Sequence, residues 1–337
     1  MVNLHEFQGK TIGIIYTFEG ENAPGFKHYH IWQSDIIAKW LEAVQDLKCR
    51  PLILDVRTFV QKAICGTLPT IDYVLNLNCG GIELSPMAVV PSICGFLHIP
   101  CIPCDSVAIL SGENKLISNL LAKAIGIQVP KTLSADDKTG IFRPLNLGSS
   151  IGVKRGPNNQ IDGIYQEFIP GYDITTPIVY NPAIECMDFM PTVVYISEED
   201  NVDWFLNEDN KSSRQGFERQ TLFNLDLQLK EKYLELVKSA SINTFCRIDA
   251  RIKCDSIEGF KKFYNSPLTL DDVYFIEINP MPTVWINNAF SHSFSEISSV
   301  SSFRPFLEEL GEFVPNCTLH NFLLCLGMAA NQSQVKK

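Results

Sequence analysis

The chain has 337 residues, of which 45% are hydrophobic and 20% are charged, and its formal net charge is −10. This composition excludes a largely disordered chain, which would carry fewer apolar residues. The acidic balance argues against non-specific binding to nucleic acids, because such binding needs a cationic surface. At about 100–200 residues per domain, the length predicts two or three domains.

The eleven cysteines are an odd number, in a chain too long to need disulfide bonds for its stability. The first ten residues lack the apolar core of a signal peptide, and no apolar run reaches the ~18 residues of a membrane span. We therefore expect a cytoplasmic protein whose cysteines are mostly small core residues. Cys101 and Cys104 form a C-x-x-C pair, but no second pair follows at zinc-finger spacing, which makes a redox or zinc role a remote alternative.

The first hundred residues alternate between strand and helix patterns. Apolar residues at three-to-four spacing from Ile36 to Leu47 predict a helix. Three short apolar runs predict buried strands: Thr11–Tyr16, Pro51–Val56 and Tyr73–Leu77. Such an alternation is typical of a parallel sheet covered by helices, so residues 1–109 are predicted to form a Rossmann-like domain. The NCGG loop at 78–81 follows the third strand, where open α/β sheets place their ligand loops.

The middle of the chain, residues 110–174, is predicted to form a small subdomain. Ser111 is the expected N-cap of a helix that ends at Gly126. The apolar stripe of this helix is expected to comprise Leu116, Ile117, Leu120, Leu121, Ala124 and Ile125. Four short β runs then follow with tight Gly turns, which favours antiparallel pairing: Gly140–Pro144, Ile151–Arg155, Gly163–Phe168 and Asp173–Tyr180.

Residues 175–330 are predicted to form an α+β domain, and residues 331–337 a flexible polar tail. Its helix is marked by apolar residues from Leu229 to Ala240. Its predicted strands are Pro191–Ile196, Val202–Leu206, Arg247–Cys254 and Asp272–Asn279, of which the last two are expected to pair.

Three oxygen-bearing side chains near the end of this domain predict a magnesium site. Glu277 and Asn279 are two apart in a strand and therefore face the same side of a sheet. If the strand from Arg247 pairs alongside, Asp249 joins them. Carboxylate and amide oxygens suit Mg²⁺ that is bound together with phosphate groups. The alternative interpretation is two solvated acids at strand ends.

A phosphate-binding region is suggested by a Gly-Ser loop and two cations. The loop LGSSIGVKRG, residues 147–156, lets backbone N–H groups and the hydroxyls of Ser149 and Ser150 approach phosphate oxygens. It is not a P-loop, because no G-K-[ST] sequence follows. Lys115 and Arg143 are placed to contact a polyphosphate. The alternatives are an ordinary hairpin and solvated surface charges.

Taken in order, these segments resemble the ATP-grasp superfamily and, within it, the D-alanine–D-alanine ligases. The resemblance covers about residues 10–300. It is clearest in five stretches: GENKLISNLLAKAIGIQVPKT (112–132), FRPLNLGSSIGVKRG (142–156), YQEFIPGYDIT (165–175), RIDARI (247–252) and FIEINPMPT (275–283). It implies an ATP-grasp fold of α/β and α+β parts, with an N-terminal Rossmann-like parallel-sheet domain, a reduced central subdomain and a C-terminal α+β domain.

The resemblance also implies a reaction. ATP lies between two antiparallel sheets, and its γ-phosphoryl group moves to a substrate carboxylate to give an acyl phosphate. An amine then displaces phosphate and leaves an amide. Asp249, Glu277 and Asn279 match the ligands of Mg²⁺, of which two ions are expected, with Mn²⁺ as a substitute. Lys115 and Arg143 match two cations on the ATP phosphates. The hydroxyl groups of the phosphate-covering loop match Ser149 and Ser150.

For the rest of ATP and the substrates, the resemblance gives further roles. The linker strand that flanks adenine matches Gln166, Glu167, Phe168 and Ile169. Asp173 matches the ribose-binding acid, and Arg247 the arginine that stabilises the tetrahedral oxyanion. Lys211 matches a γ-phosphate lysine, on a looser alignment. Either Glu19 or Glu21 matches the acid that orients the first amino acid's ammonium group. The implied catalytic residues are Arg247, Ser149 and Glu19.

Departures from the family pattern bear on the substrate. Arg143 stands where the family has Lys, Gln166 where it has an acid, and Asp173 where it has Glu. The tyrosine expected near Lys211 is missing, and the central subdomain lacks room for the family's helical insertions. Trp285 lies where the family has small residues around the carboxylate of the second D-alanine. We therefore expect a second substrate other than D-alanine.

The sequence thus predicts an ATP-dependent carboxylate–amine ligase that joins amino acids or small peptides. A true D-alanine–D-alanine ligase with a divergent acceptor pocket is the nearest alternative. A nucleotide-binding protein without ligase turnover is an alternative from another class, although two magnesium-binding acids would be of little use to it. The predicted partners are small-molecule carboxylate and amine substrates and, from the resemblance, a second copy in a homodimer. Neither nucleic acid nor membrane is an expected partner.

Overall fold

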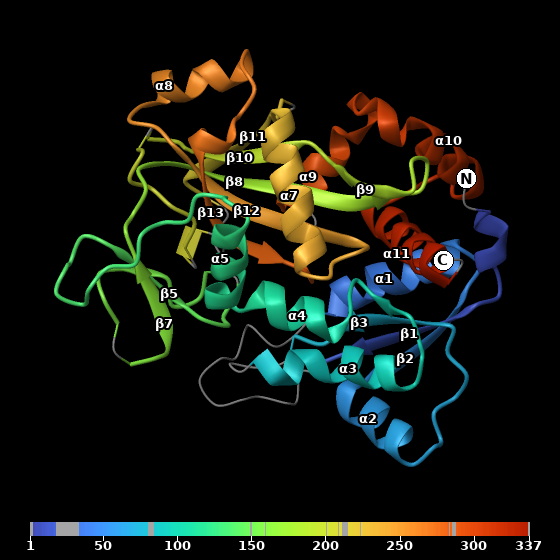
Figure 1. The fold of residues 1–337 in the computed structure, drawn as a ribbon. Coiled ribbons are helices and arrows are strands. Elements are labelled where there is room, and N and C mark those ends of the chain that lie inside the picture. Colours follow the sequence, from blue (N-terminus) through green and yellow to red (C-terminus); the bar gives the residue numbers. More distant parts are fainter. Residues whose placement is uncertain are drawn as a thin grey trace.

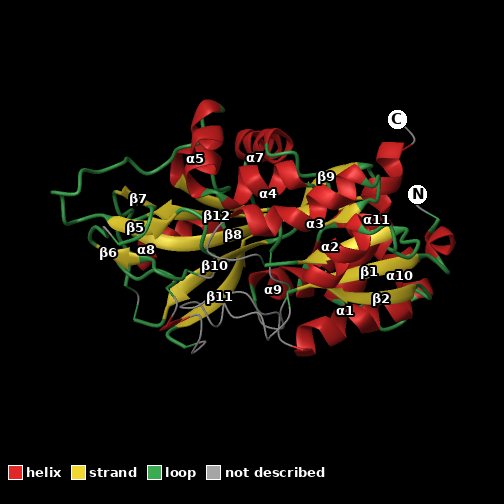
Figure 2. Cartoon of the chain, turned by 90° about the horizontal axis from the view of Figure 1, so that it is seen from below, coloured by secondary structure: helices red, strands yellow, loops and turns green. Residues whose placement is uncertain are grey.

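The computed structural model describes residues 3–17, 34–79, 84–148, 150–158, 160–199, 201–207, 209–210, 215–222, 224–282, 284 and 288–335. Within these ranges the strands form three sheets (Figure 1). Figure 2 shows the large sheet in the middle, with the N-terminal sheet at one end and a small three-stranded sheet at the other.

The N-terminal sheet is parallel, as predicted, with the strand order β2-β1-β3-β4. Its strands are β1 (Thr11–Tyr16), β2 (Arg50–Asp55), β3 (Tyr73–Leu77) and β4 (Cys101–Ile102). Helices α1 (Ser34–Asp46), α2 (Val56–Ile64), α3 (Leu84–Phe96) and α4 (Ser106–Glu113) accompany them. β3 is buried along its whole length, because it has a neighbour on each side. The prediction that the second strand is buried is wrong: β2 lies at the sheet edge, and its side chains are exposed or half-buried.

The small sheet is antiparallel, with β5 (Ile141–Pro144) between β6 (Lys154–Arg155) and β7 (Gly163–Gln166). This confirms three of the four β runs that were predicted to pair here. The fourth lies in the large sheet as β8 (Gly171–Asn181). The boundary predicted between residues 174 and 175 therefore falls inside a strand.

The large sheet has the order β11-β10-β8-β12-β13, and β9 pairs with β8. Its other strands are β9 (Cys186–Phe189), β10 (Thr192–Ser197), β11 (Phe217–Leu222), β12 (Phe245–Lys253) and β13 (Val273–Asn279). The remaining helices are α5 (Lys115–Ala124), α7 (Leu227–Ser239), α8 (Ile257–Lys261), α9 (Ala289–Ser295), α10 (Arg304–Phe313) and α11 (Leu319–Val335). Short 3-10 helices cover Leu4–Phe7, Lys262–Tyr264, Leu270–Asp272, Ile297–Ser299 and Ser301–Phe303.

Two C-terminal predictions need comment. Val202–Leu206 is not a strand: the carbonyls of Val202 and Trp204 accept hydrogen bonds from Arg251, and its only backbone bond to β8 is that from the N–H of Gly171 to the carbonyl of Val202 among the described residues. β10 pairs with β8 on one side and with β11 on the other, and the sequence pattern did not indicate β11. α11 continues to Val335, past the start of the predicted flexible tail. It packs between the N-terminal and large sheets, which explains why its sides are apolar nearly all round.

Helix α5 buries a polar face and exposes an apolar one. Ser111 lies inside α4, so the predicted N-cap is wrong; Asn114 caps α5 and accepts from the N–H groups of Leu116 and Ile117, at 3.1 Å each. The helix residues 42–58% exposed to solvent are Leu116, Ile117 and Leu120. The buried residues are instead Lys115, Ser118, Asn119 and Ala122. Of the predicted apolar stripe, Leu121 and Ile125 are partly buried and pack against the core of the large sheet. The other members are exposed, because the polar face makes the contacts with β13 and the small sheet described below.

A β-bulge at Ile276 changes the side-chain alternation of β13. Asp249 of β12 pairs with Glu277, whereas the next residue, Ala250, pairs with Phe275, so Ile276 is extra. Phe275 is therefore in the core and Glu277 outside it, although they are two residues apart. The carbonyl of Ile276 accepts hydrogen bonds from Arg143 of β5 (2.7 Å) and from Asn119 of α5 (3.2 Å). The bulge thus joins the large sheet to the small one.

The eleven cysteines are free, and six of them are buried. Burial raises the pKa of the Cys104 thiol well above its usual value, and the pKa of Cys101 is also raised, by a hydrogen bond with Cys94 and by burial. Thiols of this kind are poor nucleophiles, in keeping with core packing rather than redox chemistry. No helix in the described ranges has both the length and the apolar character needed to cross a membrane.

Because His320 of α11 is buried, we expect the folded protein to lose stability at acidic pH. It packs edge-on against Trp40 of α1, with ring centroids 4.7 Å apart, and burial lowers its pKa to about 4. The folded state therefore binds fewer protons than the unfolded state between about pH 4 and 6.5. The stability that the neutral His320 contributes is fully present above pH 6.5. The free energy of unfolding then decreases as the pH falls towards 4, by about 3 kcal/mol in total, at about 1.36 kcal/mol per pH unit.

Urea unfolding of the His320→Gln variant at several pH values would test this effect. We expect the variant to lose less unfolding free energy than the wild type between pH 7 and 4.5. His5→Gln, at an exposed position, serves as the control and should retain the wild-type pH dependence. Parallel pH profiles for His320→Gln and the wild type would contradict the prediction.

Candidate active site

The three predicted magnesium ligands meet where the end of β13 lies against the middle of β12. Asp249 lies directly opposite Glu277, and Arg247 directly opposite Asn279, as the predicted strand pairing requires. The side-chain nitrogen of Asn279 donates to Asp249 Oδ2 at 2.9 Å and to Glu277 Oε1 at 3.3 Å. One amide thus lies within hydrogen-bond distance of both carboxylates.

Two cations flank this group. Lys115 Nζ lies 3.2 Å from Glu277 Oε2 and donates to the carbonyl of Leu147 at 2.7 Å. Arg247 Nε lies 3.2 Å from Asp249 Oδ2. Burial opposes the charge on Arg247, but Asp249 outweighs it, and the pKa of the guanidinium is raised. Arg247 therefore remains charged next to the two acids.

The donor set fits Mg²⁺ that is shared with phosphate oxygens. The Asp249 and Glu277 side chains are 19% and 18% exposed, so the site is accessible from solvent on one side. Two carboxylates and one amide oxygen are hard ligands, and Mg²⁺ completes its shell with water and phosphate. Within the described ranges, no three Asp, Glu, His or Cys side chains form a metal cluster. The amide of Asn279 is therefore an essential part of the predicted ligand set.

Arg143 lies where the small and large sheets meet. Its side chain donates to the carbonyl of Ile276 and to Oε1 of Gln166, and only 4% of the residue is exposed. Burial lowers the pKa of Arg143 to about 10, against the opposing effect of Glu277 and Asp173. Gln166 is also fixed by its side-chain nitrogen, which donates to Asn119 (3.1 Å) and to the carbonyl of Pro130 (2.9 Å). The two departures from the family pattern are thus hydrogen-bonded to each other.

The predicted adenine and ribose residues lie along one linker, from β7 into β8. Glu167 accepts from the backbone of Lys131 at 2.9 Å. The ring of Phe168 contacts two guanidinium groups: their central carbons lie 3.6 Å (Arg155) and 4.7 Å (Arg251) from the centroid of the ring. Ile169 is buried. Both carboxylate oxygens of Asp173 have partners, Arg251 and the N–H of Leu206, at 2.8 Å each.

The Gly-Ser loop begins beside Lys115, which holds the Leu147 carbonyl. Ser150 follows in a left-handed conformation, with φ of 61°. Several predicted residues lie outside the described part of the chain: Glu19, Glu21, Ser149, Lys211 and Trp285. Two glycines of the NCGG loop do as well, whereas its Asn78 accepts from Thr17 at 3.0 Å at the carboxyl edge of the N-terminal sheet.

Sequence reasoning missed two charged residues near the site, Glu113 and Arg251. Glu113 directly precedes the Asn-Lys pair that begins α5, so its place near Lys115 was readable from the sequence. The adjacent Gly112 packs against the end of β13, where an added Cβ would come within 2.7 Å of Pro280. Arg251 alternates with Arg247 and Asp249 in the strand and therefore faces the same side of the sheet.

Because Glu113 is buried beside the site, we expect its ionised carboxylate to lower the stability of the folded protein above neutral pH. Burial, and then the charge of Glu277, raise its pKa to about 7, while Lys115 acts in the opposite direction. The folded state therefore binds more protons than the unfolded state between about pH 4.5 and 7, and stability falls as the pH rises through this range. The ionised carboxylate should cost about 3 kcal/mol at pH 8.

Thermal unfolding of Glu113→Gln in metal-free buffer would test this cost. We expect the variant to be more stable than the wild type at pH 8, and the difference to disappear near pH 5. Glu235→Gln, on the exposed side of α7, is the control and should change little at either pH. If the Glu113→Gln variant is less stable than the wild type at pH 8, the ionised carboxylate of Glu113 does not destabilise the folded state.

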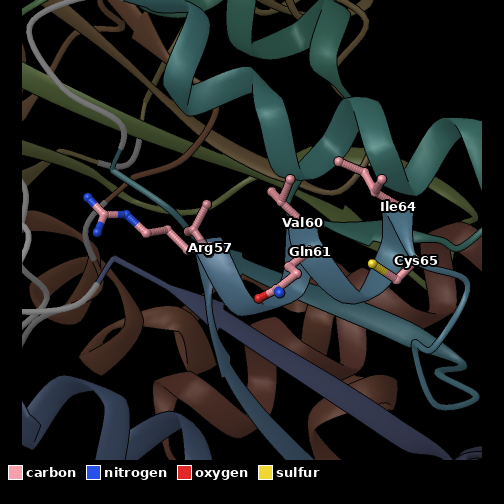
Figure 3. A pocket seen from close by; sticks show the side chains of 6 residues that line it. Arg57, Val60, Gln61, Ile64 and Cys65 are labelled. Atoms are coloured by element: carbon pink, nitrogen blue, oxygen red, sulfur yellow. The ribbon is translucent and has the colours of Figure 1, made fainter.

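A separate surface hollow lies along α2, away from this group (Figure 3). Its lining residues are Val56, Arg57, Val60, Gln61, Ile64 and Cys65. The set is largely apolar, and no residue predicted for catalysis or nucleotide binding belongs to it.

Comparison with solved structures identifies the fold. Two structures of D-alanine–D-alanine ligase from Bacillus anthracis each cover 97% of this chain and 99% of their own length, at TM-scores of 0.62 and 0.58 and 16% and 15% identity. The latter was crystallised with ATP. The VanG D-Ala:D-Ser ligase from Enterococcus faecalis covers 95% of this chain and 98% of its own, at a TM-score of 0.56 and 14% identity.

Neither protein-family models nor curated protein sequences match this chain. The similarity to these ligases is therefore one of fold, matched over nearly the whole length of the chain. The chain has the ATP-grasp fold, in the form found in D-alanine–D-alanine ligases.

Proposed function

We propose that this protein is an ATP-dependent ligase that joins a carboxylate to an amine through an acyl phosphate. The observation that carries the proposal is the group of Asp249, Glu277 and Asn279, in which the amide of Asn279 lies within hydrogen-bond distance of both carboxylates and Lys115 lies beside Glu277. In the ATP-grasp fold that we infer, this group would hold Mg²⁺ against the phosphates of ATP. A protein that only bound nucleotide would have little use for two such acids.

In the proposed reaction the chain supplies position and charge. Bound Mg²⁺, held by Asp249, Glu277 and Asn279, would offset the negative charge on the transferring phosphoryl group. Lys115 would bind the same phosphates, since its ammonium already lies between an acid and the Gly-Ser loop. Phosphoryl transfer needs little else, because its barrier is lowered mainly by positioning and electrostatic stabilisation.

Arg247 is assigned to the second half of the reaction. Its side chain remains charged beside Asp249, and its raised pKa keeps it protonated throughout the neutral range. It would stabilise the oxyanion that forms when the amine attacks the acyl phosphate. Arg143 would support the phosphates from the small sheet. Glu19 or Glu21 would orient the ammonium group of the first substrate.

Amino acids or small peptides are the substrates we propose. The solved relatives are ligases of D-alanine with D-alanine or D-serine, which favours small amino acids on at least one side. Trp285, in place of the small residues of that family, favours a different amine substrate. A true D-alanine–D-alanine ligase with a reshaped pocket is the second candidate. We further propose a cytoplasmic location and a homodimer, as in the sequence-based expectation.

ADP release tests the function directly. The purified chain, with ATP and Mg²⁺, is incubated with pooled D- and L-amino acids, and products are identified by mass. Amide formation coupled to ADP release supports the proposal, and the mass gives the substrate pair. Nucleotide binding without ADP release across the panel would favour the binding protein instead. D-alanyl-D-alanine as the main product would favour the second candidate and remove the argument from Trp285.

A further inference from the structure

Arg251 is a buried arginine that no step of the proposed reaction uses. Its side chain is 4% exposed, although it lies on the same face of β12 as Arg247 and Asp249. Burying a guanidinium is costly unless its donors are all engaged. Each of the three guanidinium nitrogens of Arg251 has at least one acceptor, and these acceptors come from two separate segments of the chain, residues 169–173 and 202–204.

Its hydrogen bonds define what it holds together. Nε donates to the carbonyl of Ile169, and Nη2 lies 2.8 Å from the carbonyl of Gly171. The same Nη2 lies 3.0 and 2.6 Å from the carbonyls of Val202 and Trp204. These bonds tie the linker after β7 and the start of β8 to the loop that precedes β11, beside the backbone bond from the N–H of Gly171 to the carbonyl of Val202 at 2.7 Å.

The remaining nitrogen of the guanidinium group, Nη1, orients Asp173. Nη1 of Arg251 lies 2.8 Å from Asp173 Oδ1, while the N–H of Leu206 lies 2.8 Å from the other oxygen. The carboxylate is fixed at both oxygens, yet each oxygen keeps a lone pair, and the side chain is still 18% exposed. An acid fixed in this way can accept a further hydrogen bond at a defined place without first losing rotamer freedom.

We propose that Arg251 is a positioning residue for the nucleotide, which holds Asp173 and the linker carbonyls in the arrangement that receives the ribose of ATP. The inference rests on the proposed function, because it takes the linker to be the nucleotide site. Lysine could not replace this arginine, since a single ammonium cannot reach all these acceptors in two segments at fixed angles.

The preference for ribose hydroxyls is the informative quantity. Dissociation constants for ATP–Mg²⁺ and for 2′,3′-dideoxy-ATP–Mg²⁺ are measured by calorimetry on the full chain. The wild type is expected to bind ATP about ten-fold more tightly than the dideoxy analogue. In Arg251→Lys this preference should fall to about two-fold or less, while kcat at saturating ATP stays within about three-fold. Because the ratio compares two ligands on one sample, a fraction of unfolded protein does not alter it.

Ile252→Val is the matched control. Ile252 is the next residue of β12, fully buried on the opposite face, so the change weakens packing without touching the linker side chains. It should retain the wild-type preference. If Arg251→Lys does not fold, Asp173→Asn tests the same arrangement and should also lose the preference.

The possible failures are distinguishable. A wild type that binds no ATP would overturn the proposed function, and this inference with it. A wild type that binds ATP but does not distinguish the dideoxy analogue would overturn this inference alone. Retention of the preference in Arg251→Lys, or an equal loss in Ile252→Val, would also overturn it and leave the proposed function standing.

Discussion

Replacing Glu277 with Gln is expected to lower kcat by about 10³-fold, with the fold retained. The change removes one of two negative charges at the proposed magnesium site and replaces a carboxylate oxygen that Lys115 contacts at 3.2 Å. The overall shape of the side chain is preserved, so packing against β12 should not change. Steady-state ADP release, measured with the substrates found by the screen, gives kcat, and circular dichroism checks the fold.

Glu258→Gln is the control for a general effect of losing one acid. Glu258 lies on the surface helix α8 and pairs with Lys261 at 2.6 Å, in a part of the chain with no proposed catalytic role. It should retain wild-type kcat. If Glu277→Gln keeps more than about a tenth of the wild-type kcat, Glu277 is not a magnesium ligand.

Replacing Gly171 with Ala is expected to destabilise the protein by about 4 kcal/mol or more. Gly171 has φ of 135°, and an added Cβ would collide with the carbonyl oxygen of Ile252. Neither backbone can yield easily, because Gly171 pairs with Lys253 in the sheet and its carbonyl accepts from Arg251. Thermal unfolding should show a midpoint lower by roughly 10 °C, or no folded protein at all.

Gly156→Ala separates the steric clash from the cost of the backbone conformation. Gly156 also has a positive φ, of 80°, but beyond its chain neighbours no atom lies within 4 Å of the place that an alanine Cβ would take. An alanine there should cost only about 1–2 kcal/mol. Equal losses at the two glycines would show that the close approach of β8 and β12 is not what excludes a side chain at Gly171.

The sequence predicted the parts of the fold that depend on local pattern. The strands at Thr11–Tyr16 and Tyr73–Leu77 are present at those residues, because a run of apolar residues indicates a strand. Whether the strand is buried depends on its place in the sheet, as the edge strand β2 shows. The meeting of Asp249 with Glu277 was also predictable, because it needs only strand alternation and one pairing. The order of the five family-like segments then pointed to the ATP-grasp fold.

What the sequence did not predict depends on partners far along the chain. α5 exposes Leu116 and Leu120 because Lys115 and Asn119 are needed against the sheets, a choice that local hydropathy cannot reveal. The 202–206 segment looked like a strand by composition. Its carbonyls bond instead to Arg251, about fifty residues later in the sequence.

The extra residue in β13 bears on how this molecule tolerates deletions. Removing Ile276 would leave a regular ladder, because all other pairs from Val273 to Asn279 already match their partners in β12. Glu277 would still face the site, and Phe275 the core. The carbonyl used by Arg143 and Asn119 would be lost. The contact between the large and small sheets therefore depends on one inserted residue. Deleting that residue alone would remove the contact, while each sheet would keep its own strand pairing.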